Sequence, residues 1–71
     1  KSAVGCQGKV YLTIPGERKG TGKVQIVINE SVREYDAVTD CDTITTGAQI
    51  KVVEVIDSST LLVEPLESLI I

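Results

Sequence analysis

The sequence contains no histidine, tryptophan, phenylalanine or methionine, and Tyr11 and Tyr35 are its only aromatic residues. Without histidine, the chain lacks the imidazole group that most often serves as a catalytic base, metal ligand or pH switch near neutrality. A serine or threonine nucleophile needs such a base beside it. Proteins that bind single strands of nucleic acid stack the bases on aromatic side chains, and two tyrosines are a poor platform. We therefore expect no enzymatic activity and assign no catalytic residue.

Cysteine is also scarce, with Cys6 and Cys41 alone. A secreted scaffold of this size usually carries more cysteines. We expect two free thiols in a reducing compartment, although the spacing also permits one disulfide. Two thiols without histidine are too few soft ligands for a metal site, and Asp40 and Asp42 alone are too few oxygens for a hard cation. We expect neither a metal nor a cofactor.

Positive charge is in the minority, because seven basic residues face ten acidic ones and the net charge is −3. Nucleic-acid-binding surfaces are usually basic. A nucleic-acid-binding domain remains the alternative only if the fold gathers Lys9, Arg18, Lys19 and Lys23 into one stripe. No apolar stretch approaches the roughly 20 residues needed to span a bilayer, and no signal peptide is recognisable.

At 71 residues the chain is one domain at most, with a limited core. It begins at Lys1, and we expect it to be a fragment of a longer protein.

Apolar residues alternate with polar ones along most of the chain. This period of two predicts five strands, in the stretches KVYLTI, KVQIVINE, VREYDAVT, IKVVEVID and TLLVEPL. In the first stretch we expect Val10, Leu12 and Ile14 to share the buried face. In the third we expect Tyr35 and Ala37 to face inward, because the acidic residues that alternate with them would be costly to bury.

Turn residues separate these stretches. Pro15-Gly16 predicts a type II turn with Gly16 at positive φ, and the sequence NES predicts a tight turn between the second and third strands. A shift in the apolar phase at Val52–Val53 predicts a bulge. The segment DTITTG offers the only place for a helical turn, capped by Asp42, unless it is plain loop.

Five consecutive strands with one interruption after the third suit an all-β fold. The alternatives are a five-stranded OB-fold-like Greek-key barrel and an SH3-like barrel. We expect residues 1–66 to form the barrel. Residues 67–71 would form a C-terminal tail that packs against the barrel or a partner.

A candidate interaction surface combines two features. The polar loop after Pro15 carries Arg18 and Lys19, the only adjacent basic pair. The final hairpin has more aliphatic residues than one buried face needs, so Val53 and Leu62 are predicted to form an exposed apolar patch.

Several short motifs follow one another along the chain in a definite order. A glycine begins the second predicted strand, and an aromatic-x-Ala-x-Thr motif ends the third. The motif I-x-x-G then precedes the fourth strand, and L-x-V-x-P forms the fifth. These positions are Gly22, Tyr35, Ala37, Thr39, Ile44, Gly47, Ile50, Val52, Val55, Leu61, Val63 and Pro65. The order and spacing resemble the C-terminal soluble domain of NfeD-like proteins. Gly5 and Gly8 resemble that family's first strand, whereas Tyr35 stands where the family often has tryptophan.

The resemblance implies a five-stranded OB barrel that acts as a non-enzymatic protein-interaction domain. In that family the domain follows transmembrane helices of a bacterial or archaeal membrane protein, and we expect it on the cytoplasmic side. The implied partner is a stomatin- or flotillin-type membrane scaffold. Long members carry a separate serine-protease domain that this sequence lacks, so a structural role within a larger enzyme is a further alternative.

Overall fold

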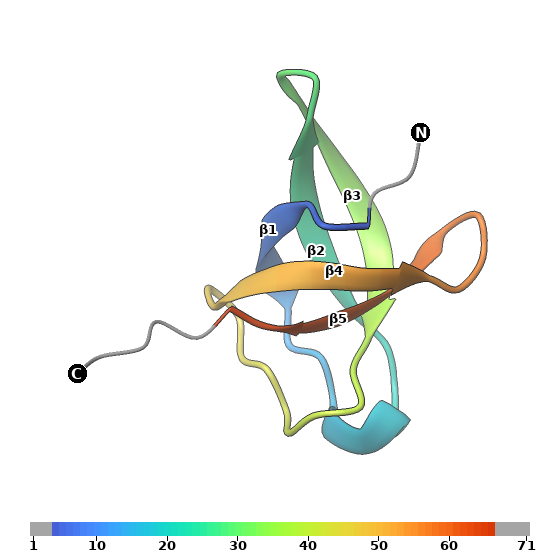
Figure 1. Ribbon diagram of the computed structural model, residues 1–71. Coiled ribbons are helices and arrows are strands. Elements are labelled where there is room, and N and C mark those ends of the chain that lie inside the picture. The colour runs from blue at the N-terminus through green and yellow to red at the C-terminus, as the bar shows by residue number, and fades with distance from the viewer. Residues whose placement is uncertain (1–3, 67–71) are drawn as a thin grey trace.

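In the computed structural model, which describes residues 4–66, five strands close into a barrel (Figure 1). The elements are β1 (Gln7–Leu12), the 3₁₀ turn η1 (Gly16–Arg18), β2 (Gly22–Ile28), β3 (Ser31–Val38), β4 (Gln49–Val55) and β5 (Thr60–Pro65). Their order around the barrel is β1-β2-β3-β5-β4. All neighbours are antiparallel except β3 and β5, which are parallel. The prediction of an all-β, five-stranded OB-fold-like barrel is confirmed. The predicted tail, residues 67–71, lies outside the described residues.

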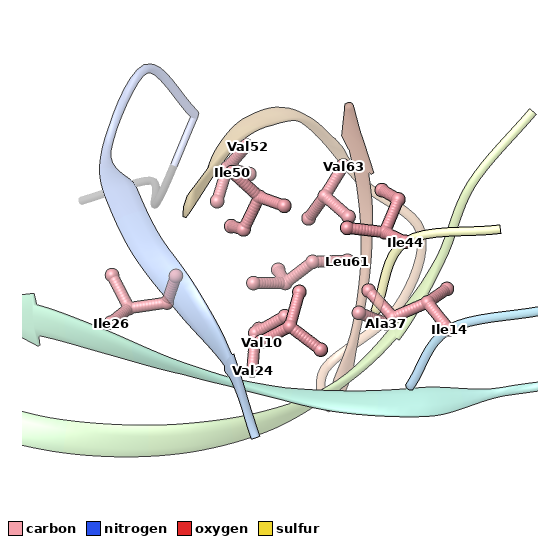
Figure 2. Close-up of a cluster of buried hydrophobic side chains, with 10 residues drawn as sticks. All are labelled: Val10, Ile14, Val24, Ile26, Ala37, Ile44, Ile50, Val52, Leu61 and Val63. Carbon is pink, nitrogen blue, oxygen red and sulfur yellow. The ribbon is translucent and has the colours of Figure 1, made fainter. Parts of the chain in front are cut away.

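The barrel interior is filled by aliphatic side chains from all five strands and from the loops at one end (Figure 2). The core residues, each at most 3% exposed, are Val10, Ile14, Val24, Ile26, Ala37, Ile44, Ile50, Val52, Leu61 and Val63. Figure 2 shows Ile14, Ala37 and Ile44 together toward one end and Ile26 toward the other. Burial of each larger aliphatic side chain contributes roughly 1.5–3 kcal/mol, so this cluster is the main source of stability.

On β2 the apolar face of the alternating pattern points into the barrel, with Val24 and Ile26 fully buried. On β3 the same holds for Ala37, while Tyr35 is half-buried and packs against the core.

The buried face predicted for β1 is wrong at Leu12, which is 50% exposed. A register shift between Val10 and Leu12 places Leu12 opposite Lys23 and turns its side chain outward. Ile14 returns to the core through an isolated bridge to Ile44. The backbones of β1 and β2 approach closely here, and only glycine fits at position 22, because a Cβ on Gly22 would lie 2.5 Å from the Leu12 carbonyl oxygen.

The bulge predicted in β4 is confirmed. The register with β5 shifts between Val52 and Glu54, so Val52 points inward and Val53 outward. The turn between β2 and β3 is also as predicted. Asn29 and Glu30 both have positive φ, 52° and 66°, which is the conformation of a tight two-residue hairpin turn.

Residues 42–47 are loop, which is the second of the two alternatives for that segment. The prediction that no other segment could hold a helical turn is wrong, because the one helical turn within residues 4–66 is η1, in the loop between β1 and β2. Gly16 is not at positive φ, so the predicted type II turn is wrong. Instead, Glu17 and Arg18 take positive φ values of 57° and 56°. Position 16 needs glycine for a different reason, namely that the loop after β3 passes close to it: a Cβ on Gly16 would lie 2.6 Å from the backbone nitrogen of Thr43.

Candidate functional site

The loop that carries Arg18 and Lys19 is fixed to the loop after β3. The Glu17 N–H donates to the Cys41 carbonyl at 2.9 Å, and the Arg18 N–H donates to the Thr39 carbonyl at 2.8 Å. Thr39 is fully buried, and its hydroxyl accepts the Cys41 N–H at 3.1 Å. These bonds join the two loops and hold η1 at one end of the barrel (Figure 1).

Both basic side chains of this loop lie beside carboxylates. Arg18 reaches Asp40 with two nitrogens, Nε to Oδ1 at 2.6 Å and Nη2 to Oδ2 at 3.3 Å. Lys19 Nζ lies 3.6 Å from a carboxylate oxygen of Glu17. All four side chains are about half exposed or more, and such surface pairs contribute little to stability. The loop therefore presents balanced charge rather than a basic patch.

The apolar half of the predicted surface is only partly exposed. Val53 lies on the outer face of β4 and is 41% exposed. Leu62 is only 8% exposed, so the prediction that it is exposed is wrong. Its strand lies between β3 and β4, with Val38 and Glu54 as its Cα partners on either side, and these neighbours limit access to it. Within residues 4–66, no hydrogen bond or ion pair joins Arg18 or Lys19 to this part of the barrel.

A different apolar surface lies on the β2–β3 hairpin, which projects beyond the rest of the barrel (Figure 1). Val27 and Val32 are 60% and 62% exposed, the highest values among the large hydrophobic residues described. They are Cα partners across the two strands, so their side chains form one apolar pair. The alternation in the sequence already indicated that Val27 is exposed, because this valine falls on the otherwise polar face of its strand.

Polar pairs continue this outer face away from the hairpin tip. Lys23 Nζ donates to Asp36 Oδ1 at 2.7 Å, and this hydrogen bond raises the pKa of Lys23 above its usual value. Gln25 Nε2 lies 3.5 Å from Glu34 Oε2. Lys23 is therefore paired, and the charge of Glu34 also raises its pKa; the one hydrogen-bond contact of Glu34 within residues 4–66 is the long one to Gln25.

A shallow groove of about 340 Å³ crosses the outer face of β1 beside the hairpin. It is lined by Gln7, Gly8, Lys9, Gln25, Val27, Val32, Gln49 and Leu66. The two exposed valines thus border the groove, and most of its other lining groups are uncharged amides and aliphatic side chains.

The thiols and carboxylates are the remaining candidate groups for metal binding. The described part of the chain has no group of three or more cysteine or acidic side chains placed to hold a metal ion. Cys6 is half-buried against the core and Cys41 is exposed, and both thiols are free. Residues 4–66 contain no helix with the length and hydrophobicity that a bilayer crossing demands.

No family model matches the chain, and neither does any curated protein. Several solved chains match its fold, among them two soluble domains of membrane proteins. The soluble domain of the NfeD protein YuaF from Bacillus subtilis superposes with a TM-score of 0.75 and 30% sequence identity, over 92% of this chain and 75% of that one. The second is the soluble domain of a Corynebacterium glutamicum membrane protein implicated in regulation of membrane protease activity. It superposes with a TM-score of 0.62 and 18% identity, over 92% of this chain and 94% of that one, and this likeness shows the shared fold alone.

Proposed function

The chain belongs to the NfeD family as one of its soluble domains, and on this premise we propose that it is a non-enzymatic protein-interaction domain of a membrane protein. The partner we propose is a stomatin- or flotillin-type membrane scaffold, bound on the cytoplasmic side. The observation that carries the proposal is the exposed apolar pair of Val27 and Val32 on a projecting hairpin.

Exposed apolar side chains favour a binding role when they are contiguous. Scattered single ones are ordinary on any protein surface. Val27 and Val32 are paired across neighbouring strands and border a groove, so they offer one continuous contact area. The rim is polar, as protein-binding surfaces usually are.

The polar groups support binding rather than catalysis. Lys23 and Arg18 are each held in a surface ion pair. The described serine and threonine hydroxyls lack an imidazole partner, because the sequence contains no histidine.

The nucleic-acid alternative requires a basic stripe of unpaired side chains. Arg18 and Lys23 lie against Asp40 and Asp36, and Lys19 lies near Glu17. Lys9 is the one member of the predicted stripe that makes no ion pair within residues 4–66. The pairing of the other three leaves little positive potential for phosphates, which dominate the affinity of nucleic-acid binding. Fluorescence anisotropy with labelled single-stranded DNA at low salt tests this alternative. Salt-dependent binding would favour it over protein interaction.

The direct test is co-purification from membranes. The full-length protein and a version lacking residues 4–66 would be tagged, expressed at equal levels, and recovered in the same mild detergent. Quantitative mass spectrometry should recover a stomatin- or flotillin-type protein with the full-length form and lose it with the deletion. Equal recovery from both forms would refute the proposed function.

A further inference from the structure

One edge of β3 is left without a neighbouring strand. β2 pairs with β3 along its whole length, from Ser31 to Ala37. β5 pairs only with Asp36–Val38 on the other side. Within residues 4–66, no strand pairs with that other side of Ser31–Tyr35, and residues 31–34 are all exposed. We call this segment the β3 edge.

The register shows which backbone groups point outward from the β3 edge. Because the turn has two residues, Ile28 and Ser31 form a hydrogen-bonded pair. Hydrogen-bonded pairs alternate along antiparallel strands, so the N–H and C=O groups of Val32 and Glu34 point away from β2. Asp36 is next in this alternation, and its N–H donates to the Ser59 carbonyl at 3.0 Å, which confirms the phase.

We propose that the β3 edge binds an extended segment of a partner protein as an added strand, in line with β5. This proposal rests on the proposed function and names its binding mode. The backbone groups of Val32 and Glu34 supply the hydrogen bonds, as in other cases of strand addition. The partner strand carries an apolar residue beside Val32 and a basic residue beside Glu34, since neighbouring side chains on one face of a sheet interact.

The charges along the β3 edge disfavour pairing with a second copy of the chain and favour a different protein. Two copies that pair antiparallel about a two-fold axis must place residues with outward-pointing backbone groups opposite one another. Three such registers have their centre within residues 32–34. One centres on Arg33 opposite Arg33 and one on Glu34 opposite Glu34. The third pairs Val32 with Val32 but brings Glu34 to the level of Glu30. Like charges directly opposite destabilise a sheet, and charged edges are a known protection against self-association.

The same charges favour a basic strand. Within residues 4–66 Glu34 makes no ion pair: its charge acts on Lys23 without contact, its hydrogen bond to Gln25 is long, and Asp36 at the inner end is already paired with Lys23. A lysine or arginine on the incoming strand would therefore find an acceptor at Glu34. Val27 lies beside Val32 and extends the apolar contact toward the groove on β1.

The first test uses random twelve-residue peptides displayed on phage, selected on the 71-residue chain. We expect peptides with an apolar and a basic residue two positions apart, on one face of the added strand, and NMR of the labelled chain with a synthetic copy should show slowed exchange of the Val32 and Glu34 amides. Peptides that bind another surface, or that lack basic residues, would overturn the proposal. So would a selection that enriches nothing.

Matched variants test the charge and the backbone separately. Glu34→Lys should weaken the selected peptide by at least about tenfold, which corresponds to about 1.4 kcal/mol. Glu54→Lys makes the same charge change on the exposed part of β4 and should change binding less than about twofold. Equal effects would mean that net charge alone drives binding. N-methylation of the peptide at the alternate residues that face the β3 edge should abolish binding, and methylation of the other residues should not.

Co-purification separates this proposal from the proposed function. If deletion of residues 4–66 loses the partner and Glu34→Lys also loses it, both stand. If the deletion loses the partner but Glu34→Lys recovers it fully, the β3 edge is not the site and the interaction function stands. If the deletion changes nothing, the proposed function fails. A stable dimer of the purified chain that Glu34→Lys dissociates would replace the partner strand with a second copy.

Discussion

Two valines on β2 allow the contribution of the barrel core to be measured within one strand. Val24 is fully buried and Val27 is 60% exposed, three residues apart on the same strand. Truncation of each to alanine removes the same atoms. We expect Val24→Ala to destabilise the fold strongly and Val27→Ala only slightly.

The magnitude follows from burial. Val24→Ala removes two buried methyl equivalents, each worth about 0.8 kcal/mol in transfer from water. The surrounding side chains belong to a closed barrel and can relax only in part, which adds a cavity cost of about 24 cal/mol per Å³. Together these give about 2–3 kcal/mol. Val27 leaves no enclosed cavity, so its loss should be about 0.5 kcal/mol, most of it strand preference.

Such a loss is large for this chain. At about 0.05–0.15 kcal/mol per residue, a domain of 71 residues has a total stability of about 4–11 kcal/mol. A loss of 2–3 kcal/mol should lower the Tm by roughly 10–20 °C in a domain of this size. Urea unfolding followed by far-ultraviolet circular dichroism measures both variants, and the slope of the transition should stay unchanged.

The refuting result is a comparison rather than a single value. If Val24→Ala costs no more than Val27→Ala, the interior near Val24 is not packed as described. A large loss at Val27 would instead mean that the hairpin face is covered by something within the chain.

Three further predictions concern other parts of the barrel. Gly22→Ala should cost at least about 2 kcal/mol in urea unfolding, because its Cβ would meet a carbonyl oxygen of β1, and a change below about 0.5 kcal/mol would contradict the close approach. The hydrogen bond from the Ser59 N–H holds the pKa of Asp57 below its usual 3.8, so the pKa is lower in the folded chain than in the unfolded one. The charged carboxylate therefore stabilises the fold above the unfolded pKa, and this stabilisation is lost as the pH falls through the folded pKa. Asp57→Ala should therefore destabilise the chain at pH 7 more than at pH 2, and an equal loss at both would argue against it. A double-mutant cycle on Arg18 and Asp40 should give a coupling of about 0.2–1 kcal/mol that shrinks in high salt, whereas a larger coupling independent of salt would mean that the pair is shielded from water.

The alternation of residues predicted the strands because each strand has one buried face. Val24, Ile26 and Ala37 follow this rule, and the phase shift at Val52–Val53 correctly indicated a bulge. The same reasoning failed at Leu12, where a second bulge reverses the expected face. That bulge depends on a backbone contact with β2, which no local pattern in the first strand encodes.

The loops and the surface were harder to predict for related reasons. Glu17 and Arg18 adopt positive φ, which ordinary residues rarely do, so their turn carries no sequence signal. Leu62 is buried by neighbours on two other strands, a consequence of strand order rather than of its own segment. The unpaired part of β3 likewise becomes visible only when the lengths of β3 and β5 are compared in space.

The strand order also has a consequence for how the chain folds. β2 and β3 meet through a two-residue turn, and isolated hairpins form within about 1–10 μs. Closure needs β1 to find β4, with Gln7 paired to Lys51 across most of the sequence. Pairing over such separations is slow, with millisecond to second folding typical of small β barrels. We therefore expect the hairpin to be in place long before the barrel is shut, so that substitutions in its turn slow folding while substitutions at the β1–β4 seam mainly speed unfolding.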